Sequence, residues 1–304
     1  MMLAALAIAL AAAKAASDAD RCALPEGWQV ATIGDPRYIV FGEDHGTVEG
    51  PTEFGTIACA LSGTGARLLV AVELSAPQND ALQAAWALPR GRFADALTQT
   101  MPDWRERNDG VTSEAMLALL VRLHALKTAG RVIDVVAFNG ERDEAQRKRF
   151  ADLPAQGPHE AAQAENIRIA EQKREYDRVL VLVGVVHALK RPVPMAGTTF
   201  EPMAMRLTDE QQVLGLNLIY GRGTGWSCEL REGAIVQPGK PIGEADISCG
   251  VHPQRGREGF GGGPRIGLWP NDWQKYDDLA WDGYFWVGPA HASPPALAEA
   301  GKPQ

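Results

Sequence analysis

Positive charge is scarce in this chain, and no long basic run is present. The 304 residues carry 30 Lys and Arg against 38 Asp and Glu, so the formal net charge at pH 7 is −8. Proteins that bind DNA or RNA neutralise phosphates with clustered Lys and Arg side chains. The composition therefore argues against nucleic acid as a partner. Hydrophobic residues at 45% and charged residues at 22% are ordinary for a globular protein with a sizeable core.

Several common catalytic signatures are also missing. The chain has no Gly-x-Ser-x-Gly elbow, no phosphate-binding loop and no glycine-rich dinucleotide fingerprint after its first expected strand. His159 and Glu160 begin a helical pattern, but no second histidine follows four residues later, so the metalloprotease motif is absent. The glycine-rich stretch 221–225 follows a late strand and is only a weak phosphate signal. Any chemistry is therefore expected from other histidines and carboxylates.

Only four cysteines are present, and no two of them form a Cys-x-x-Cys pair. A zinc site built from thiolates is therefore not expected. Cys228 and Cys249 flank a hairpin-like segment and can form one disulfide, which leaves Cys22 to pair with Cys59. Four cysteines allow three connectivities, and buried free thiols are the alternative.

An apolar stretch opens the chain, but it is too short to span a bilayer comfortably. Small residues follow it, as at a signal-peptidase site, so residues 1–16 are predicted to be a signal peptide. Disulfides form in oxidising compartments, so they also agree with export of the protein. The expected compartment is the bacterial periplasm, and no membrane span is expected in the mature chain. No basic residue precedes the apolar core, so an alanine-rich amphipathic or disordered start is the alternative.

Strands and helices alternate from about residue 37 to residue 220. The segment 132–138 is nearly continuous in apolar residues, as parallel strands covered on both faces are. Thr112, Ser113 and Glu114 open an amphipathic helix. The pattern predicts an α/β fold: a mostly parallel sheet with helices on both faces, plus a small cysteine-containing β-rich C-terminal subregion. Further strands are expected at 37–42, 67–73, 179–186 and 213–220, and further helices at 51–61, 77–88 and 158–176.

The composition changes after residue 220, where glycines and then aromatic residues become frequent. We predict a single domain over residues 25–290, with its core at 37–220 and a C-terminal β and loop subregion at 221–290. Segment 282–287 is expected to add an edge strand. Residues 291–304 are expected to be a disordered tail. The late aromatic residues are expected to pack in the core, or to form a wall of the site.

Two segments share one pattern, in which an apolar strand ends on a glycine and a histidine follows three residues later. These are Gly42 with His45 and Gly184 with His187. A third apolar run ends on Glu73. Because the carboxyl ends of parallel strands share one rim, the two histidines and Glu73 are expected to converge within about 10 Å.

Each of these residues also has a simpler structural explanation. Either histidine could be bonded to a backbone carbonyl in the core, and Glu73 could cap the next helix, although Ser75 would serve as well. The carboxylates around His45 favour a functional role, because they raise the pKa of an imidazole and can orient it or bind a metal. They are Glu43, Asp44 and Glu49.

Two polar residues follow the third strand at the same rim. Asn139 and Arg142 could bind an oxyanion or orient Glu73. Together with Glu43, Asp44 and Glu49 they are the predicted substrate-binding residues.

Taken together, these motifs resemble the erythromycin esterase/ChaN-like superfamily, which also includes the Tiki and TraB proteins. The resemblance rests on Gly-Glu-Asp-His-Gly at 42–46 with Glu49, on Glu73, and on Gly-Val-Val-His at 184–187. It covers residues 37–220 and implies an α/β core with the active site at the sheet rim. The chain is shorter than macrolide esterases and lacks much of their helical lid, and its cysteine-bearing segment matches none of the branches.

The resemblance implies three alternatives for function. The first is an exported hydrolase of ester or amide bonds, in which His45 acts as general base, Glu73 orients it and His187 polarises the scissile carbonyl. The second is a periplasmic haem- or metal-binding protein of the ChaN type. The third is a metal-dependent Tiki/TraB-like protease with His45, Glu73 and His187 as metal ligands. Depending on the alternative, the expected cofactor is a divalent metal, haem or none. The expected partner is a small-molecule or peptide substrate.

Overall fold

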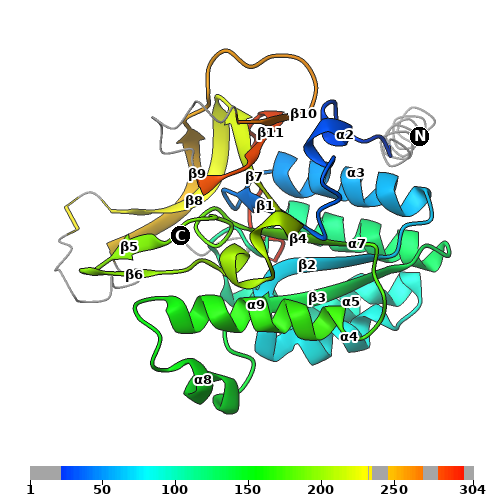
Figure 1. Cartoon of the computed structure of the whole chain (residues 1–304), viewed down its shortest axis with the longest axis horizontal. Helices are drawn as coiled ribbons and strands as arrows, with labels where there is room; N and C mark the ends of the chain where they lie inside the picture. Colours follow the sequence, from blue (N-terminus) through cyan, green and yellow to red (C-terminus); the bar gives the residue numbers. More distant parts are fainter. Residues whose placement is uncertain (1–21, 232, 235–245, 270–279, 298–304) are drawn as a thin grey trace, which may run out of the picture.

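The computed structural model describes residues 22–231, 233–234, 246–269 and 280–297, and a seven-stranded sheet lies at its centre (Figure 1). Neighbouring strands are parallel except for the antiparallel pair at one edge, β10 and β11. In spatial order the strands are β10 (Arg265–Leu268), β11 (Gly283–Pro289), β7 (Val213–Gly221), β1 (Tyr38–Glu43), β4 (Arg178–Gly184), β2 (Leu68–Ser75) and β3 (Ile133–Asn139). The predicted α/β class is confirmed. The predicted signal peptide lies outside the described residues.

Alternate residues of the central strands enter two separate apolar clusters, because successive strand side chains point to opposite faces. Ile39 and Phe41 of β1 pack on one face, and Tyr38 and Val40 pack on the other. The first face is covered by α3 (Glu49–Gly63), α4 (Asn79–Trp86), α5 (Arg90–Thr100) and α7 (Glu114–Thr128), and the second by α9 (Gly157–Glu171). Three shorter helices are α2 (Trp28–Ala31), α6 (Asp103–Glu106) and α8 (Glu144–Phe150). Among the described helices, none combines the length and apolar character that a membrane crossing requires.

The predicted start of α7 is confirmed in detail. Ser113 precedes the helix in an extended conformation, and its side chain accepts a hydrogen bond from the backbone amide of Met116 at 3.3 Å. This cap satisfies one of the amides that a helix start leaves without a partner. The expected helix 158–176 is shorter than predicted: α9 ends at Glu171, because the chain must straighten to pair Asp177 with Arg67 ahead of β4.

The C-terminal region contributes more to the main sheet than predicted. β11 was expected at an edge, but it lies between β7 and β10, and the edge strand is β10. β10 comes from the end of a glycine- and arginine-rich segment within the predicted β and loop subregion at 221–290, where no strand was expected at these residues. Short antiparallel strands with few apolar residues leave little pattern in a sequence.

The prediction of a disordered tail is wrong for residues 291–297. Ser293 is buried, its amide donates to Gly46 at 2.8 Å, and its hydroxyl accepts from Ala115 at 2.9 Å. These contacts fix the segment between the start of α7 and the loop after β1. Residues 298–304 lie outside the described part of the chain.

Both predicted disulfides are present. Cys22 is joined to Cys59 on α3, and Cys228 is joined to Cys249. The second bond links β8 (Gly223–Leu230) to β9 (Ile247–Gln254), where the two cysteines are direct partners in an antiparallel hairpin. A smaller hairpin is formed by β5 (Val193–Met195) and β6 (Thr198–Phe200).

Candidate functional site

The three residues that the motifs singled out meet at the carboxyl ends of three adjacent strands. His45 follows β1, His187 follows β4, and Glu73 lies near the end of β2. His45 Nε2 is 3.1 Å from Glu73 Oε2, and His187 Nε2 is 3.7 Å from Glu73 Oε1. Glu73 therefore lies between the two imidazoles, as the strand-end argument predicted.

Glu73 is held as an anion. Burial alone would raise its pKa, but the charges of His45 and His187 and a 2.6 Å hydrogen bond from the Gly184 amide lower the pKa to about 2. An ionised carboxylate can accept hydrogen bonds from both histidines. Glu73 therefore stays ionised over the whole neutral pH range, where it holds the His45 ring at 3.1 Å and attracts His187 by its charge.

The glycine of each motif makes room for another group. A Cβ on Gly184 would lie 3.1 Å from His45 Nε2 and 3.5 Å from Glu73 Oε2. A Cβ on Gly42 would lie 2.3 Å from the ring of Trp281, which packs against β1. The sequence pattern therefore has a steric cause, since a side chain at either position would displace part of the site.

His45 is bound by a carboxylate at each ring nitrogen. Its Nδ1 is 3.1 Å from Glu43 Oε1, and its Nε2 faces Glu73. Burial would lower the pKa of His45, but the charges and hydrogen bonds of Glu73 and Glu43 raise it well above the usual 6.5. A carboxylate at each ring nitrogen favours the imidazolium form of His45, in which both nitrogens donate. Burial also raises the pKa of Glu43, whose second oxygen has no hydrogen-bond partner among the described residues.

His187 is bound differently, through a residue that the sequence did not single out as functional. Its Nδ1 lies 2.7 Å from Glu160 Oε1, and the other oxygen of Glu160 accepts from the Met203 amide at 2.8 Å. Glu160 is fully buried at the start of α9. A carboxylate on Nδ1 fixes the tautomer that leaves the Nε2 lone pair free, and 3.7 Å to Glu73 is too long for a hydrogen bond. Burial would lower the pKa of His187, but Glu160 and Glu73 raise it.

A second imidazole lies beside His187. The ring of His159 is 5.5 Å from that of His187, and burial together with the His187 charge lowers the pKa of His159. Asn139 reaches this group only indirectly, because its oxygen accepts from Gln163, and Gln163 also contacts His159.

The other predicted substrate-binding residues divide into two groups. Glu43 contacts His45, and Asp44 borders a cavity next to it. Glu49 and Arg142 are placed elsewhere. Glu49 begins α3 and binds His291 at 2.6 Å. Arg142 lies near α8 and α9, where it forms ion pairs with Asp143 at 3.0 Å and Glu165 at 3.5 Å. Their loops leave the sheet rim as the neighbouring helices begin, so strand-end position alone did not predict where they point.

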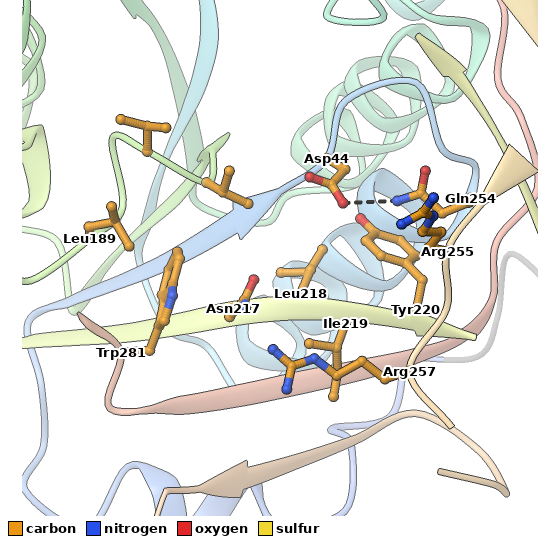
Figure 2. A pocket seen from close by; sticks show the side chains of 12 residues that line it. Asp44, Leu189, Asn217, Leu218, Ile219, Tyr220, Gln254, Arg255, Arg257 and Trp281 are labelled. Carbon is orange, nitrogen blue, oxygen red and sulfur yellow. Dashed lines mark hydrogen bonds between the residues drawn. The ribbon is translucent and has the colours of Figure 1, made fainter. Parts of the chain in front are cut away.

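Two cavities adjoin the site, and Val186 lines both. The first has a volume of about 360 Å³ and is bordered by Asp44, Tyr220, Trp281 and other residues (Figure 2). The second, of about 690 Å³, is bordered by His187, His159 and apolar residues that include Met195 and Phe200. The segment that carries His187 therefore borders both cavities.

The donor set does not fit a divalent metal in this arrangement. The described residues hold no group of three or more His, Cys, Asp or Glu side chains placed to bind one. Both nitrogens of His45 face carboxylates, and the Nδ1 of His187 faces Glu160, so the three predicted ligands offer a single free imidazole nitrogen. The predicted role of His45 as a metal ligand is not supported by this geometry.

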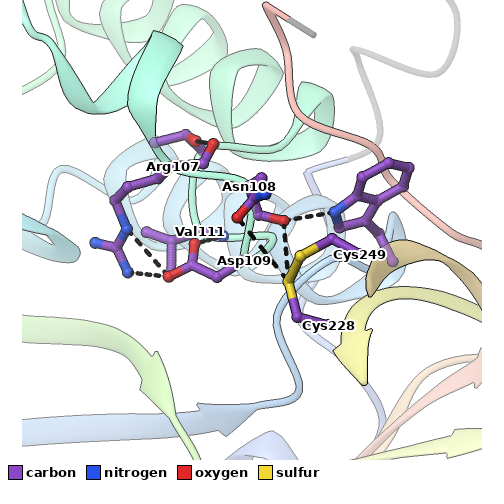
Figure 3. Close-up of a disulfide and its surroundings, with 8 residues drawn as sticks. Arg107, Asn108, Asp109, Val111, Cys228 and Cys249 are labelled. Atoms are coloured by element: carbon purple, nitrogen blue, oxygen red, sulfur yellow. Dashed lines mark hydrogen bonds and ion pairs between the residues drawn. A yellow bond between two sulfur atoms is a disulfide. The ribbon is translucent and has the colours of Figure 1, made fainter. Parts of the chain in front are cut away.

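A β-hairpin supports the loop that carries His45. Trp226 of β8 donates its backbone amide to Gly46 at 2.9 Å and its indole NH to the Asn108 carbonyl at 2.6 Å. Figure 3 shows Asn108 beside the Cys228–Cys249 disulfide. A Cβ on Gly110 would lie 2.6 Å from the Gly46 nitrogen, so the loops at 107–110 and 44–46 are in close contact.

Comparison with known proteins identifies the fold. No family model and no curated sequence matches the chain. A solved erythromycin esterase mutant (EreC) in its open conformation is similar at 13% identity and a TM-score of 0.56, covering 90% of this chain and 94% of that one. A Bacillus cereus protein is similar at 11% identity and a TM-score of 0.55, covering 88% and 91%. A haem-bound ChaN of Campylobacter jejuni matches 64% of this chain and 85% of that one at 13% identity, with a TM-score of 0.40 that is too low to indicate a shared fold. The chain therefore has the α/β fold of erythromycin esterase, at low sequence identity, as its motifs predicted.

Proposed function

We propose that this protein is a hydrolase that cleaves an ester or amide bond with water activated at the His45–Glu73–His187 site. The observation that carries the proposal is the unequal binding of the two histidines. His187 has a buried carboxylate on Nδ1 and a free Nε2, whereas His45 has a carboxylate on each nitrogen. One imidazole thus has a nitrogen free to accept a proton, and the other carries a positive charge held between two carboxylates.

These positions reverse the roles that the motifs suggested. His187 Nε2 takes a proton from water as the water oxygen attacks the carbonyl carbon, and Glu160 stabilises the resulting imidazolium. The carbonyl electron pair moves to oxygen, where the cationic His45 stabilises the negative charge. When the bond to the leaving group breaks, His187 returns its proton to the leaving oxygen or nitrogen. Glu73 stays ionised and holds the His45 ring, while Glu160 holds that of His187.

The compartment is part of the proposal. Two disulfides are present, and such bonds persist in oxidising compartments. With the predicted signal peptide at residues 1–16, they support an exported protein of the bacterial periplasm.

The test is turnover of a panel of aryl esters and amides by wild type and single variants. His187→Ala and His45→Ala are each expected to lower kcat by about 100-fold or more. Glu160→Gln is expected to lower kcat and to move the acidic limb of the pH–rate profile to lower pH, because the carboxylate that raises the pKa of His187 is lost. Glu165→Gln on the same helix, whose partners are Arg142, Gln146 and Arg149, is the matched control and keeps the wild-type profile.

A haem-binding protein is the second candidate, and one observation favours it. His187 and His159 both border a mainly apolar cavity of about 690 Å³, where an imidazole could serve as axial ligand. Absorbance of the purified protein decides between the two. Stoichiometric haem with a Soret band that His187→Ala abolishes, and no turnover of any ester or amide, would replace the hydrolase proposal.

A further inference from the structure

The β5–β6 hairpin forms part of the wall of the larger cavity beside His187. Three of its side chains line this cavity, and all three are apolar: Val193, Met195 and Phe200. The polar residues that line the cavity come from other segments, and they are Glu141, Gln156, His159 and His187. The hairpin therefore presents an apolar surface to the cavity.

The pairing of the two strands explains why these three side chains share one face. Val193 is paired with Phe200, so their side chains point to the same side of the ribbon, and Met195 lies two residues after Val193. Pro194 and Thr199 are paired with each other on the opposite face, and neither of them lines the cavity. One face of the hairpin is thus turned toward the cavity and the other away from it.

Part of this apolar lining is exposed to solvent. All residues from 194 to 199 are exposed, and Figure 1 shows the hairpin projecting at the left edge of the molecule. Met195 is 37% exposed, and Val186, which also lines the cavity, is 39% exposed. Large apolar side chains that are exposed together beside a few polar groups are typical of ligand-binding sites. An apolar ligand would remove this surface from water, which is favourable.

The hairpin is held in a fixed position relative to the proposed catalytic residues. Just after β6, the Ala204 amide donates to the His187 carbonyl at 3.0 Å, and the Met203 amide donates to Glu160 at 2.8 Å. The two residues between the strands both have positive φ, at 49° and 81°, as in a type I′ turn, which suits the twist of a hairpin. A group bound on the hairpin therefore lies at a defined place beside His187.

We propose that the apolar face of the hairpin, formed by Val193, Met195 and Phe200, binds an alkyl chain of the substrate. The enzyme then prefers esters or amides with a medium-length alkyl chain on one side of the scissile bond. A volume of about 690 Å³ is in the range of cavities that bind small molecules. The substrate class rests on the proposed hydrolase function, whereas the apolar site can be tested without it.

Binding is measured first, by ligand-observed NMR titration with hexanamide and the shorter butanamide. Each fully buried CH₂ group strengthens binding about four-fold, so wild type is expected to bind hexanamide about ten-fold more tightly. Val193→Ser/Met195→Ser should abolish the preference. Pro194→Ser/Thr199→Ser, on the opposite face of the same hairpin, is the matched control and should retain it. Equal affinities in wild type, no binding of either amide, or a preference that survives in the Val193/Met195 variant would overturn the site.

Turnover is measured second, with two pairs of esters that place the alkyl chain on either side of the bond. Phenyl hexanoate is compared with phenyl butanoate, and p-butylphenyl acetate with p-ethylphenyl acetate. In one of the two pairs the longer ester is expected to have about ten-fold higher kcat/KM, and the Val193/Met195 variant should lose this advantage. Hydrolysis of these esters with no preference for length in either pair would refute the substrate class and leave the hydrolase intact. A hexanamide preference that depends on the hairpin face, without turnover of any ester, would refute the hydrolase and leave the apolar site intact.

Discussion

Gly184 determines how closely His45, Glu73 and β4 approach one another. Its amide donates to Glu73, and its lack of a side chain leaves room for both His45 and Glu73. A substitution here therefore tests the geometry of the site without removing any ionisable group.

Gly184→Ala is expected to lower kcat roughly 10- to 100-fold while the protein stays folded, because the added methyl carbon lies 3.1 Å from His45 Nε2 and shifts the ring from Glu73. Steady-state kinetics and the thermal midpoint measure the two effects. Gly215→Ala is the control, since it crowds only the flexible Lys190 side chain, also at 3.1 Å. Wild-type kcat in Gly184→Ala would show that the His45–Glu73 contact is not needed.

The convergence of His45, Glu73 and His187 could be predicted from the sequence, whereas the contact of the buried Glu160 with them could not. His45, Glu73 and His187 were predictable because apolar strands define where each one ends, and parallel strands end at one rim. Glu160 was not, because an acidic residue in the first turn of a helix is ordinarily explained by the helix dipole. Its contact with His187 depends on how α9 packs on the sheet, which no local pattern encodes.

At the scale of elements, the β8–β9 hairpin supports the loop that carries His45. Its disulfide lies beside Asn108 (Figure 3). Trp226 donates hydrogen bonds to both Asn108 and Gly46. The cysteine spacing predicted this hairpin. The sequence could not show that it packs on the loop at 107–110, which is more than a hundred residues away in the chain.

Cys228→Ser/Cys249→Ser is expected to lower kcat/KM several-fold, because a looser hairpin no longer holds the 44–46 loop through Trp226. Hydrogen exchange should increase in 223–230 and in 107–112. Cys22→Ser/Cys59→Ser is the matched control: loss of this disulfide, which joins residues 37 apart in sequence, lowers the free energy of unfolding by about 4 kcal/mol but leaves kcat/KM unchanged. If both variants lost activity equally, the hairpin would have no specific role.

At the scale of the whole molecule, the coupled charges of the site make the free energy of unfolding decrease at both low and high pH. Glu73 has its pKa lowered to about 2, so its contribution is present above its ordinary value of 4.5 and is lost as the pH falls toward 2. His45 has its pKa raised, so its contribution is complete below 6.5 and is lost as the pH rises through the folded value. Both contributions are complete together only between about pH 5 and pH 6.5.

The free energy of unfolding of wild type is therefore expected to peak in that window and to fall toward both pH 3 and pH 9. His45→Gln should flatten the alkaline decline, because the group that binds a proton in the folded state is gone. It should also weaken the acid decline, because Glu73 loses the cation that lowers its pKa. His187 and Glu43, whose pKa values are also raised, keep a residual alkaline slope.

Urea unfolding at several pH values measures the curve. The control is His291→Gln, at an exposed histidine bound to Glu49, which should keep the wild-type shape. An unchanged alkaline slope in His45→Gln would mean that His45 is neutral in the folded protein, and its role as the cation of the site would then be wrong.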